Sequence, residues 1–309
     1  MKFLMLLVLI FFTSFSFLSL ILSLNFSFGS ESDYKLQLRW GTNGTENGQF
    51  MGPHSMAIDS KGDIYVTDRD NHRIQKFTSD GEFITKWGTK GNGEGEFSSP
   101  EGIDVDSHGN VYVADTGNSR IQKFTSDGEF ITEWGTEGIG DGEFSSHAHG
   151  VTKDSFDYIY VTDRFNNNIQ KFTSDGEFIT KWGTKGNGDG QFNEPHSSIV
   201  DRYGNVFVSD MNNHRVQIFT SHGEFITKWG TTGNGTGELE LPLGIGIDSQ
   251  GNIFIIDLVT PSIHQFSKEG QFLKKINFNF NKLEDIEIDS NDNIYVTDIN
   301  TNEILKFSK

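Results

Sequence analysis

The five tryptophans of the chain lie at almost equal intervals, and this spacing constrains the fold more than any other feature of the sequence. Successive tryptophans are separated by 47, 47, 48 and 47 residues. They are Trp40, Trp87, Trp134, Trp182 and Trp229. A repeat of this length is typical of propeller blades or of paired helices, in which each unit packs mainly on its neighbours. Residues 30–309 have room for about six such units.

The residues within one unit decide between these two architectures. Between residues 100 and 135, four short runs rich in β-branched and aromatic residues alternate with Gly, Asn, Asp and Ser. Asp127-Gly128 is a hairpin signal between the third and fourth runs, and no window shows the 3.6-residue periodicity of a helix. The sequence therefore predicts an all-β fold, a six-bladed β-propeller of four-stranded antiparallel blades.

The two ends of the repeat region predict how the ring closes. The last unit, residues 286–307, has three strand-like runs and lacks a fourth. The segment at residues 34–40 reads as a fourth strand with no blade before it. We expect this N-terminal strand to complete the last blade, because pairing the two ends removes an open sheet edge.

The first 29 residues predict export. They carry one charge, at Lys2, and change from an apolar run to small residues, with Ser27 and Gly29 placed for a cut before Ser30. This order is typical of a signal peptide, and an uncleaved anchor is the alternative because the apolar run is long. Both interpretations place the propeller of residues 34–309 outside the cytoplasm, secreted or anchored, with no other membrane contact.

Composition narrows the classes of site and partner. The chain has no Cys, and 43 acidic against 25 basic residues give a formal net charge of −18. The absence of Cys excludes disulfides, Cys-ligated zinc and Cys nucleophiles. The negative charge argues against nucleic acid and anionic membranes as partners. We therefore expect a monomer that holds a protein, peptide or glycan.

Most recurrent polar residues have structural explanations. An Asp ends the second strand of every unit, and in three units an Arg five positions later, such as Arg120 after Asp115, is expected to pair with it. Another Asp, such as Asp106, opens the turn after each first strand. Short Asx side chains favour such turns, whereas the full ligand series of a calcium loop is missing. The recurrent Trp and Phe are expected to pack neighbouring blades together.

One position, just before or at the start of each innermost strand, differs from unit to unit in an informative way. Its occupants in chain order are His54, Glu101, His149, His196, Leu243 and Glu284. Innermost strands surround the channel of a propeller, so these residues are expected to form a ring at one mouth, with His147 nearby. Imidazole and carboxylate ligands suit divalent transition metals, zinc foremost. Hydrated polar side chains without a metal are the alternative.

The segment 106–124, followed by the Gly-rich stretch 135–144, resembles an NHL repeat. The motif returns in six registers, so the resemblance covers residues 36–309. It implies the same six-bladed propeller that the period predicts. It implies little about function, because this fold hosts enzymes, sensors and binding modules.

Residues 53–58 with 65–71, and residues 195–197, are similar to peptidyl-α-hydroxyglycine α-amidating lyases. The resemblance implies zinc ligands at His54, His149 and His196, and catalytic arginines at Arg69 and Arg164. The chain departs from that family at blade 5, where the ring residue is Leu243. No Tyr stands at the position of the family's catalytic Tyr, which here holds Asp70, Gly117, Phe165, Asn212, Val259 and Asn300.

Three functions follow from these patterns. The first is an exported binding module, and the second is a metal-dependent lyase or hydrolase built on the ring. The third is nucleic-acid binding, as in the NHL domains of tripartite-motif proteins, and the net charge opposes it. Residues 77–97, 124–144 and 172–192 are near-identical copies. They favour the binding module, because a catalytic site needs blades that differ.

Overall fold

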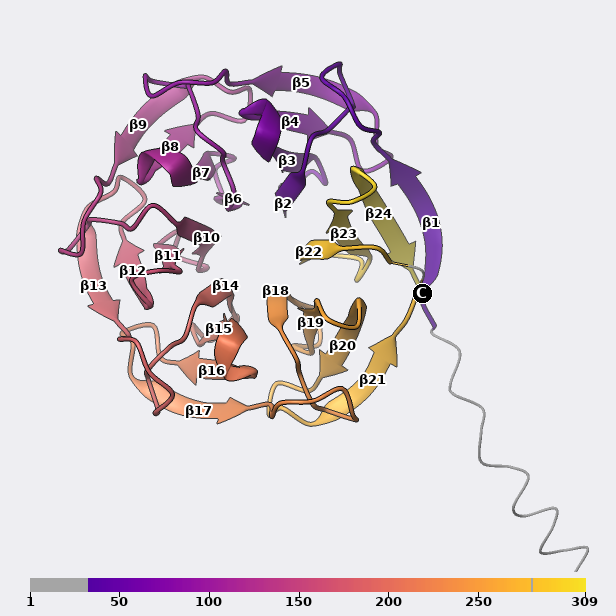
Figure 1. Ribbon diagram of the computed structural model, residues 1–309. Coiled ribbons are helices and arrows are strands. Elements are labelled where there is room, and N and C mark those ends of the chain that lie inside the picture. Colours follow the sequence, from indigo (N-terminus) through magenta and orange to yellow (C-terminus); the bar gives the residue numbers. More distant parts are fainter. Residues whose placement is uncertain (1–32, 279) are drawn as a thin grey trace, which may run out of the picture. The chain divides into compact units, whose positions relative to one another are not determined.

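Six antiparallel sheets of four strands stand around a central axis in the computed structural model, which describes residues 33–278 and 280–309 (Figure 1). Blade 1 comprises β2 (Pro53–Ile58), β3 (Ile64–Asp68), β4 (Arg73–Phe77) and β5 (Phe83–Trp87). Blade 2 comprises β6 (Ile103–Val105), β7 (Val111–Asp115), β8 (Arg120–Phe124) and β9 (Phe130–Trp134). Blade 3 comprises β10 (Ala148–Lys153), β11 (Ile159–Asp163), β12 (Asn168–Phe172) and β13 (Phe178–Trp182). Blade 4 comprises β14 (Pro195–Val200), β15 (Val206–Asp210), β16 (Arg215–Phe219) and β17 (Phe225–Trp229), and blade 5 comprises β18 (Pro242–Ile247), β19 (Ile253–Asp257), β20 (Ser262–Phe266) and β21 (Phe272–Ile276).

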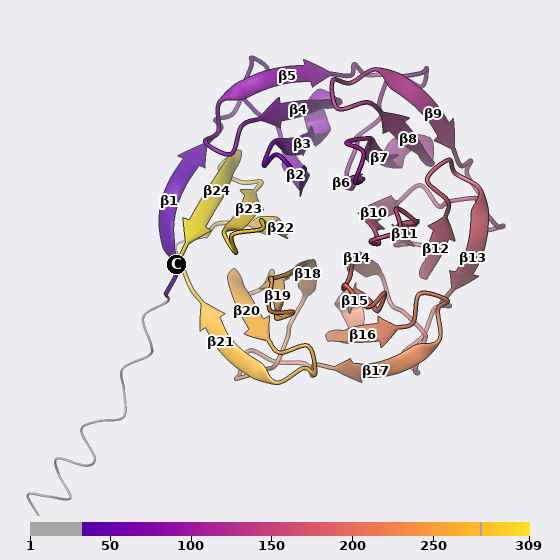
Figure 2. The same cartoon turned by 180° about the vertical axis from the view of Figure 1, so that it is seen from behind.

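The sixth blade closes the ring as the sequence predicts. It comprises β22 (Leu283–Ile288), β23 (Ile294–Asp298), β24 (Glu303–Ser308) and, on its outer side, β1 (Lys35–Trp40). Strands β1 and β24 run antiparallel, with Lys35 opposite Ser308 and Trp40 opposite Ile304 (Figures 1 and 2). The N-terminal strand therefore covers an edge that would otherwise be open. The predicted export segment, residues 1–29, lies outside the described residues.

Helical structure in the described part of the chain is limited to three short 3-10 turns, η1 (Arg69–Asn71), η2 (Thr116–Asn118) and η3 (Met211–Asn213). Each follows the Asp that ends a second strand. None of the helices in residues 33–278 and 280–309 is long and apolar enough to cross a membrane.

Aromatic side chains join neighbouring blades, as expected. The Trp that ends five of the six outer strands packs on a Phe of the next blade, with Trp87 and Phe124 ring centroids 5.9 Å apart. A Gly of the next blade's hairpin lies against the same indole. Gly128 has φ +87°, and a Cβ atom there would lie 2.6 Å from Trp87. This position therefore needs glycine both for its backbone conformation and for the close approach.

The predicted Asp–Arg pairs are present, and each arginine also donates hydrogen bonds to a loop outside the turn. Arg120 donates from Nε to Asp115 Oδ2 at 2.8 Å, and its terminal nitrogens donate to the carbonyls of Asn92, Gly93 and Glu96 in the Gly-rich loop. Arg73 and Arg215 repeat this arrangement in blades 1 and 4. The pair thus ties the third strand of a blade to the loop that enters the blade.

The turn aspartates also behave as predicted. Asp106 accepts hydrogen bonds from the backbone nitrogens of His108 and Asn110 and from the Tyr112 hydroxyl. Its carboxylate is therefore used by the β6–β7 turn.

Candidate functional site

The predicted ring residues converge at one mouth of the channel. His54, His149, His196 and Glu284 are the second residues of β2, β10, β14 and β22, and Glu101 lies two residues before β6. Hydroxyl groups of neighbouring blades fix the backbone here, since Thr297 donates to the His54 carbonyl and Thr67 to the Glu101 carbonyl. All five polar side chains are buried, with exposed fractions of 3–8%.

The imidazoles and carboxylates lie in close contact. Glu284 Oε1 lies 3.1 Å from His196 Nε2 and 3.4 Å from His54 Nε2. Glu101 lies 3.9 Å from His54 Nε2 and 3.7 Å from His149 Nε2. His149 also approaches the rings of both other histidines, with centroids 5.1 Å from His54 and 4.0 Å from His196. The five groups form one cluster.

Burial sets the charge state of this cluster. It lowers the pKa of His54 and of His149 well below the usual value, and it lowers the pKa of His196 to about 3, with nearby Arg164 acting in the same direction. Burial raises the pKa of Glu101 to about 7, although Arg69 opposes the rise. The imidazoles are therefore neutral at pH 7, which is the form that binds metals.

Three buried polar atoms of the cluster have no hydrogen-bond partner in the part of the chain that the structure describes. Within the described residues, Nδ1 of His54, Nδ1 of His196 and Oε2 of Glu101 are buried without a hydrogen-bond partner. His54, His149 and Glu284 each offer a ligand atom within 4.8 Å of the others. Two His and one carboxylate form a set that holds a divalent transition metal and leaves coordination positions open.

The space enclosed by the ring suits an ion rather than an organic molecule. The cavity there has a volume of about 10 Å³ and is lined by ring residues and by Ser55, Ser197 and Asp285. That is about the space of one water molecule. The residues present therefore fit a single metal ion.

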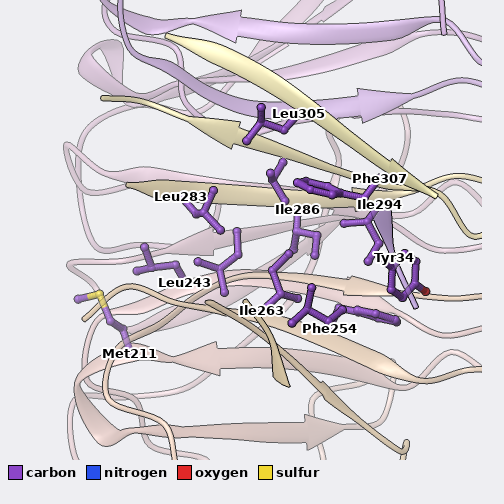
Figure 3. Packing of buried hydrophobic residues seen from close by; sticks show 13 residues of the cluster. Tyr34, Met211, Leu243, Phe254, Ile263, Leu283, Ile286, Ile294, Leu305 and Phe307 are labelled. Carbon is purple, nitrogen blue, oxygen red and sulfur yellow. The ribbon is translucent and has the colours of Figure 1, made fainter. Parts of the chain in front are cut away.

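Two residues at or near the ring position take no part in the polar cluster. His147 stacks on Phe165, with centroids 4.1 Å apart. Leu243, the blade 5 member, packs into the apolar cluster between blades 5 and 6 beside Leu283 and Met211 (Figure 3). The gap that Leu243 leaves in the polar ring is bridged by the His196–Glu284 contact.

The two predicted catalytic arginines lie beside the ring, each with an outer carboxylate. Arg69 Nε is 2.9 Å from Asp70 Oδ1, and its NH1 is 4.0 Å from Glu101 Oε1. Arg164 is bound to Glu194 at 2.7 Å. They supply positive charge at this mouth without contacting the candidate metal ligands His54 and His149.

Deeper in the channel lie polar residues that the sequence reasoning missed. Asp285 accepts hydrogen bonds from Ser55 Oγ at 2.6 Å and from the Met56 nitrogen. Burial raises the pKa of Asp104 and of Asp285 to about 6, and burial next to these two carboxylates raises that of Glu287 well above its usual value. Comparison of the inner strands across the repeat could have found two of them, because the equivalent positions read Ala57, Asp104, Thr152, Ile199, Gly246 and Glu287.

Comparisons with known families agree with the fold. The family described as NHL repeat matches residues 50–77 and 97–124. The family described as 6-bladed beta-propeller matches residues 147–206 and 203–298. With six blades in the structure, these matches define the class as a repeat-built β-propeller. The chain belongs to the NHL-repeat six-bladed β-propellers, which confirms the resemblance seen in the sequence.

Similar single proteins add little to this assignment. A B-box type zinc finger protein of Caenorhabditis elegans is 44% identical over 45 residues, which are 15% of this chain and 5% of that protein. The chain thus matches only a small part of that curated relative.

Solved structures of similar fold include enzymes. Virginiamycin B lyase from Staphylococcus aureus shares 16% identity over 90% of this chain and 100% of its own, with a TM-score of 0.62. A gluconolactonase from Xanthomonas campestris shares 13% over 84% and 87%, with a TM-score of 0.64. Identities this low show the fold alone.

Proposed function

We propose that this chain is a binding module whose ligand, a protein, peptide or glycan, docks at a divalent metal held by the ring. The observation that supports it is the cluster of His54, His149 and Glu284, buried groups that each offer a ligand atom within 4.8 Å of the others and whose imidazoles are neutral. Burying such groups without partners costs free energy, and a bound cation would recover it. Zinc is the leading ion, because imidazole and carboxylate are its usual ligands here.

The metal site and the charges at the mouth of the channel also favour a ligand with an anionic group. A metal held by His54, His149 and Glu284 keeps positions for an oxygen donor from outside. Arg69 and Arg164 add two guanidinium groups near these positions. A carboxylate or another anionic group of the ligand would be attracted to both. The proposed location outside the cytoplasm and the monomeric state rest on the sequence alone.

One observation favours a second function, a metal-dependent lyase or hydrolase. Glu101 has a pKa of about 7 and a buried oxygen without a partner, beside two candidate metal ligands. A carboxyl that titrates near neutrality is suited to move a proton. A metal bound beside it would act as a Lewis acid on a substrate oxygen. In this reading Glu101 is the acid–base residue, and Arg69 lies close enough to orient an anionic substrate.

The metal site is tested by elemental analysis and by zinc titration of the purified protein. We expect one equivalent of metal, with affinity reduced at least about tenfold in His54→Ala and in His149→Ala. His222→Ala removes an exposed histidine and serves as the control. A wild-type protein that takes up no metal would contradict the proposal.

The same preparations separate the two functions. Retention of ligands on peptide and glycan arrays should disappear when the metal is chelated. Turnover in lactone, ester and lyase screens that is lost in Glu101→Gln, with the metal content unchanged, would instead support the enzyme. Array binding that survives chelation would show that the ligand does not dock at the metal.

A further inference from the structure

Three cavities follow one another through the channel and share their walls. The ring cavity shares Ser55, Gly150, Ser197 and Asp285 with a middle cavity of about 30 Å³. The middle cavity shares Asp104 and Glu287 with a third cavity of about 710 Å³. The wide third cavity lies among the β2–β3, β6–β7 and β22–β23 turns, at the opposite end of the inner strands. The shared wall residues place the middle cavity between the ring and the opposite mouth, and we call the three cavities together the passage.

The passage is lined by carboxylates that four of the six blades lack at the same position, although Asp104 accepts hydrogen bonds from the backbone nitrogens of Val105 and Lys153. Asp104 and Glu287 occupy a position where the other four blades carry Ala57, Thr152, Ile199 and Gly246. Those four blades form the same strands without a carboxylate. Both groups are partly buried and close enough to affect each other's ionisation, which is unfavourable for folding. Asp285 continues the row toward Glu284 of the ring.

The other approach to the ring carries the opposite charge. Arg69 and Arg164 stand on the side of the Gly-rich loops, and both act electrostatically on ring histidines. Their partners Asp70 and Glu194 reduce this charge in part. A cation arriving from that side meets guanidinium groups first, whereas the wide mouth presents five carboxylates against three lysines, Lys61, Lys153 and Lys306.

We propose that a divalent cation reaches the ring from the wide mouth, through the passage lined by Asp104, Glu287 and Asp285. This inference rests on the proposed metal site and adds the route by which that site is filled. The middle cavity has room for about two water molecules. The cation therefore sheds most of its hydration shell, and carboxylate and serine oxygens replace the lost waters, as acidic side chains do in cation pores.

The route is tested by stopped-flow loading of the metal-free protein with Co²⁺, followed by its visible absorption. Asp104→Asn combined with Glu287→Gln should slow loading about tenfold or more. Release to excess chelator should slow by a similar factor, because the same passage is used in both directions. The equilibrium affinity should change much less than either rate. Asp80→Asn, which removes an exposed carboxylate of a hairpin turn, is the matched control.

Ionic strength gives a second, independent measurement. Wild-type loading should slow as salt screens the carboxylates, and the double variant should lose this dependence. The variant removes two mutually unfavourable charges but also one of the two oxygens with which Asp104 accepts backbone hydrogen bonds, so its urea unfolding is compared with that of the parent. Loading at the wild-type rate in the double variant would overturn the route while leaving the metal site intact. Absence of any cobalt absorption in the wild type would instead refute the metal site itself.

Discussion

Replacing His264 by Gln should stabilise the propeller, and increasingly so as the pH falls. The equivalent residues of blades 1–4 are Gln75, Gln122, Gln170 and Gln217. Each of these donates to a carbonyl of the Gly-rich loop and accepts from a loop glycine nitrogen, at 2.7–3.0 Å. Blade 5 carries a histidine in the same place.

His264 does not make these bonds. Its side chain is 0% exposed, and neither ring nitrogen has a well-aligned partner, although the Glu238 carbonyl faces the ring. Burial lowers its pKa to about 4, with Lys275 acting in the same direction and Asp257 against it. A Gln at this site could bond to Glu238 and to Gly237. Satisfying buried groups in this way is worth about 1–2 kcal/mol.

The lowered pKa gives the sign and size of the pH effect. The unfolded chain binds a proton at His264 near pH 6.5, and the folded chain binds it only near pH 4. Stability from the neutral imidazole is therefore complete above pH 6.5 and is lost as the pH falls toward 4. Between pH 7.5 and pH 4.5 this single group should cost the wild type about 2.5 kcal/mol, and the Gln variant nothing.

Urea unfolding followed by tryptophan fluorescence measures the difference. Trp229, which packs on Phe266 with centroids 4.5 Å apart, reports on blade 5 directly. The other buried histidines titrate in both proteins, so subtracting the two curves isolates His264. His222→Gln, at an exposed site, should change neither stability nor its pH dependence. A His264→Gln variant that is less stable at pH 7.5, or that keeps the wild-type pH dependence, would refute the reasoning.

Two further perturbations test the scaffold. Arg120→Ala removes the cation paired with the fully buried Asp115, which keeps its neutral donors, and removes a donor from three loop carbonyls, so urea unfolding should show a loss of about 3–5 kcal/mol. Arg39→Ala removes an exposed pair with Glu303 and should change stability by less than about 1 kcal/mol; equal losses in both variants would argue against the role of the buried pair. Deleting residues 34–40 uncovers β24 and removes buried Tyr34, so a loss of at least about 5 kcal/mol and self-association in size-exclusion chromatography are expected. A truncated protein that stays monomeric and as stable as the parent would contradict the closure.

The fold was predictable because repetition multiplies every local signal. A turn or a strand that is ambiguous once becomes clear when it returns every 47 or 48 residues. The closure followed from counting strands at the two ends, and the ring followed from aligning one position across six units. These inferences needed the order of the residues along the chain and little three-dimensional detail.

The place of Asp285 in the channel could not be predicted by the same means. In a regular strand, side chains alternate between faces, so only one of two consecutive residues would face the channel. The pairing of β2 with β3 shifts register between Pro53 and Met56, and β22 with β23 shifts between Leu283 and Ile286. Such irregularities re-aim side chains. Both Glu284 and Asp285 consequently line the ring cavity, which strand periodicity does not reveal.

Blade 5 departs from the repeat at two separate places, its innermost strand and its third strand. Each departure changes a contact that other blades use to hold the propeller together. At its inner end, Leu243 gives an apolar contact where five other blades give a His or a Glu. In its third strand, Ser262 and His264 replace the Arg and the Gln that tie strand to loop in blades 1, 2 and 4. A cation bound to the polar ring would link inner strands of the other blades and leave blade 5 to the apolar cluster that it shares with blade 6 and Tyr34 (Figure 3). Because the ring residues take no part in the Asp–Arg–Gln network, a chain built by copying can vary them without weakening the blades.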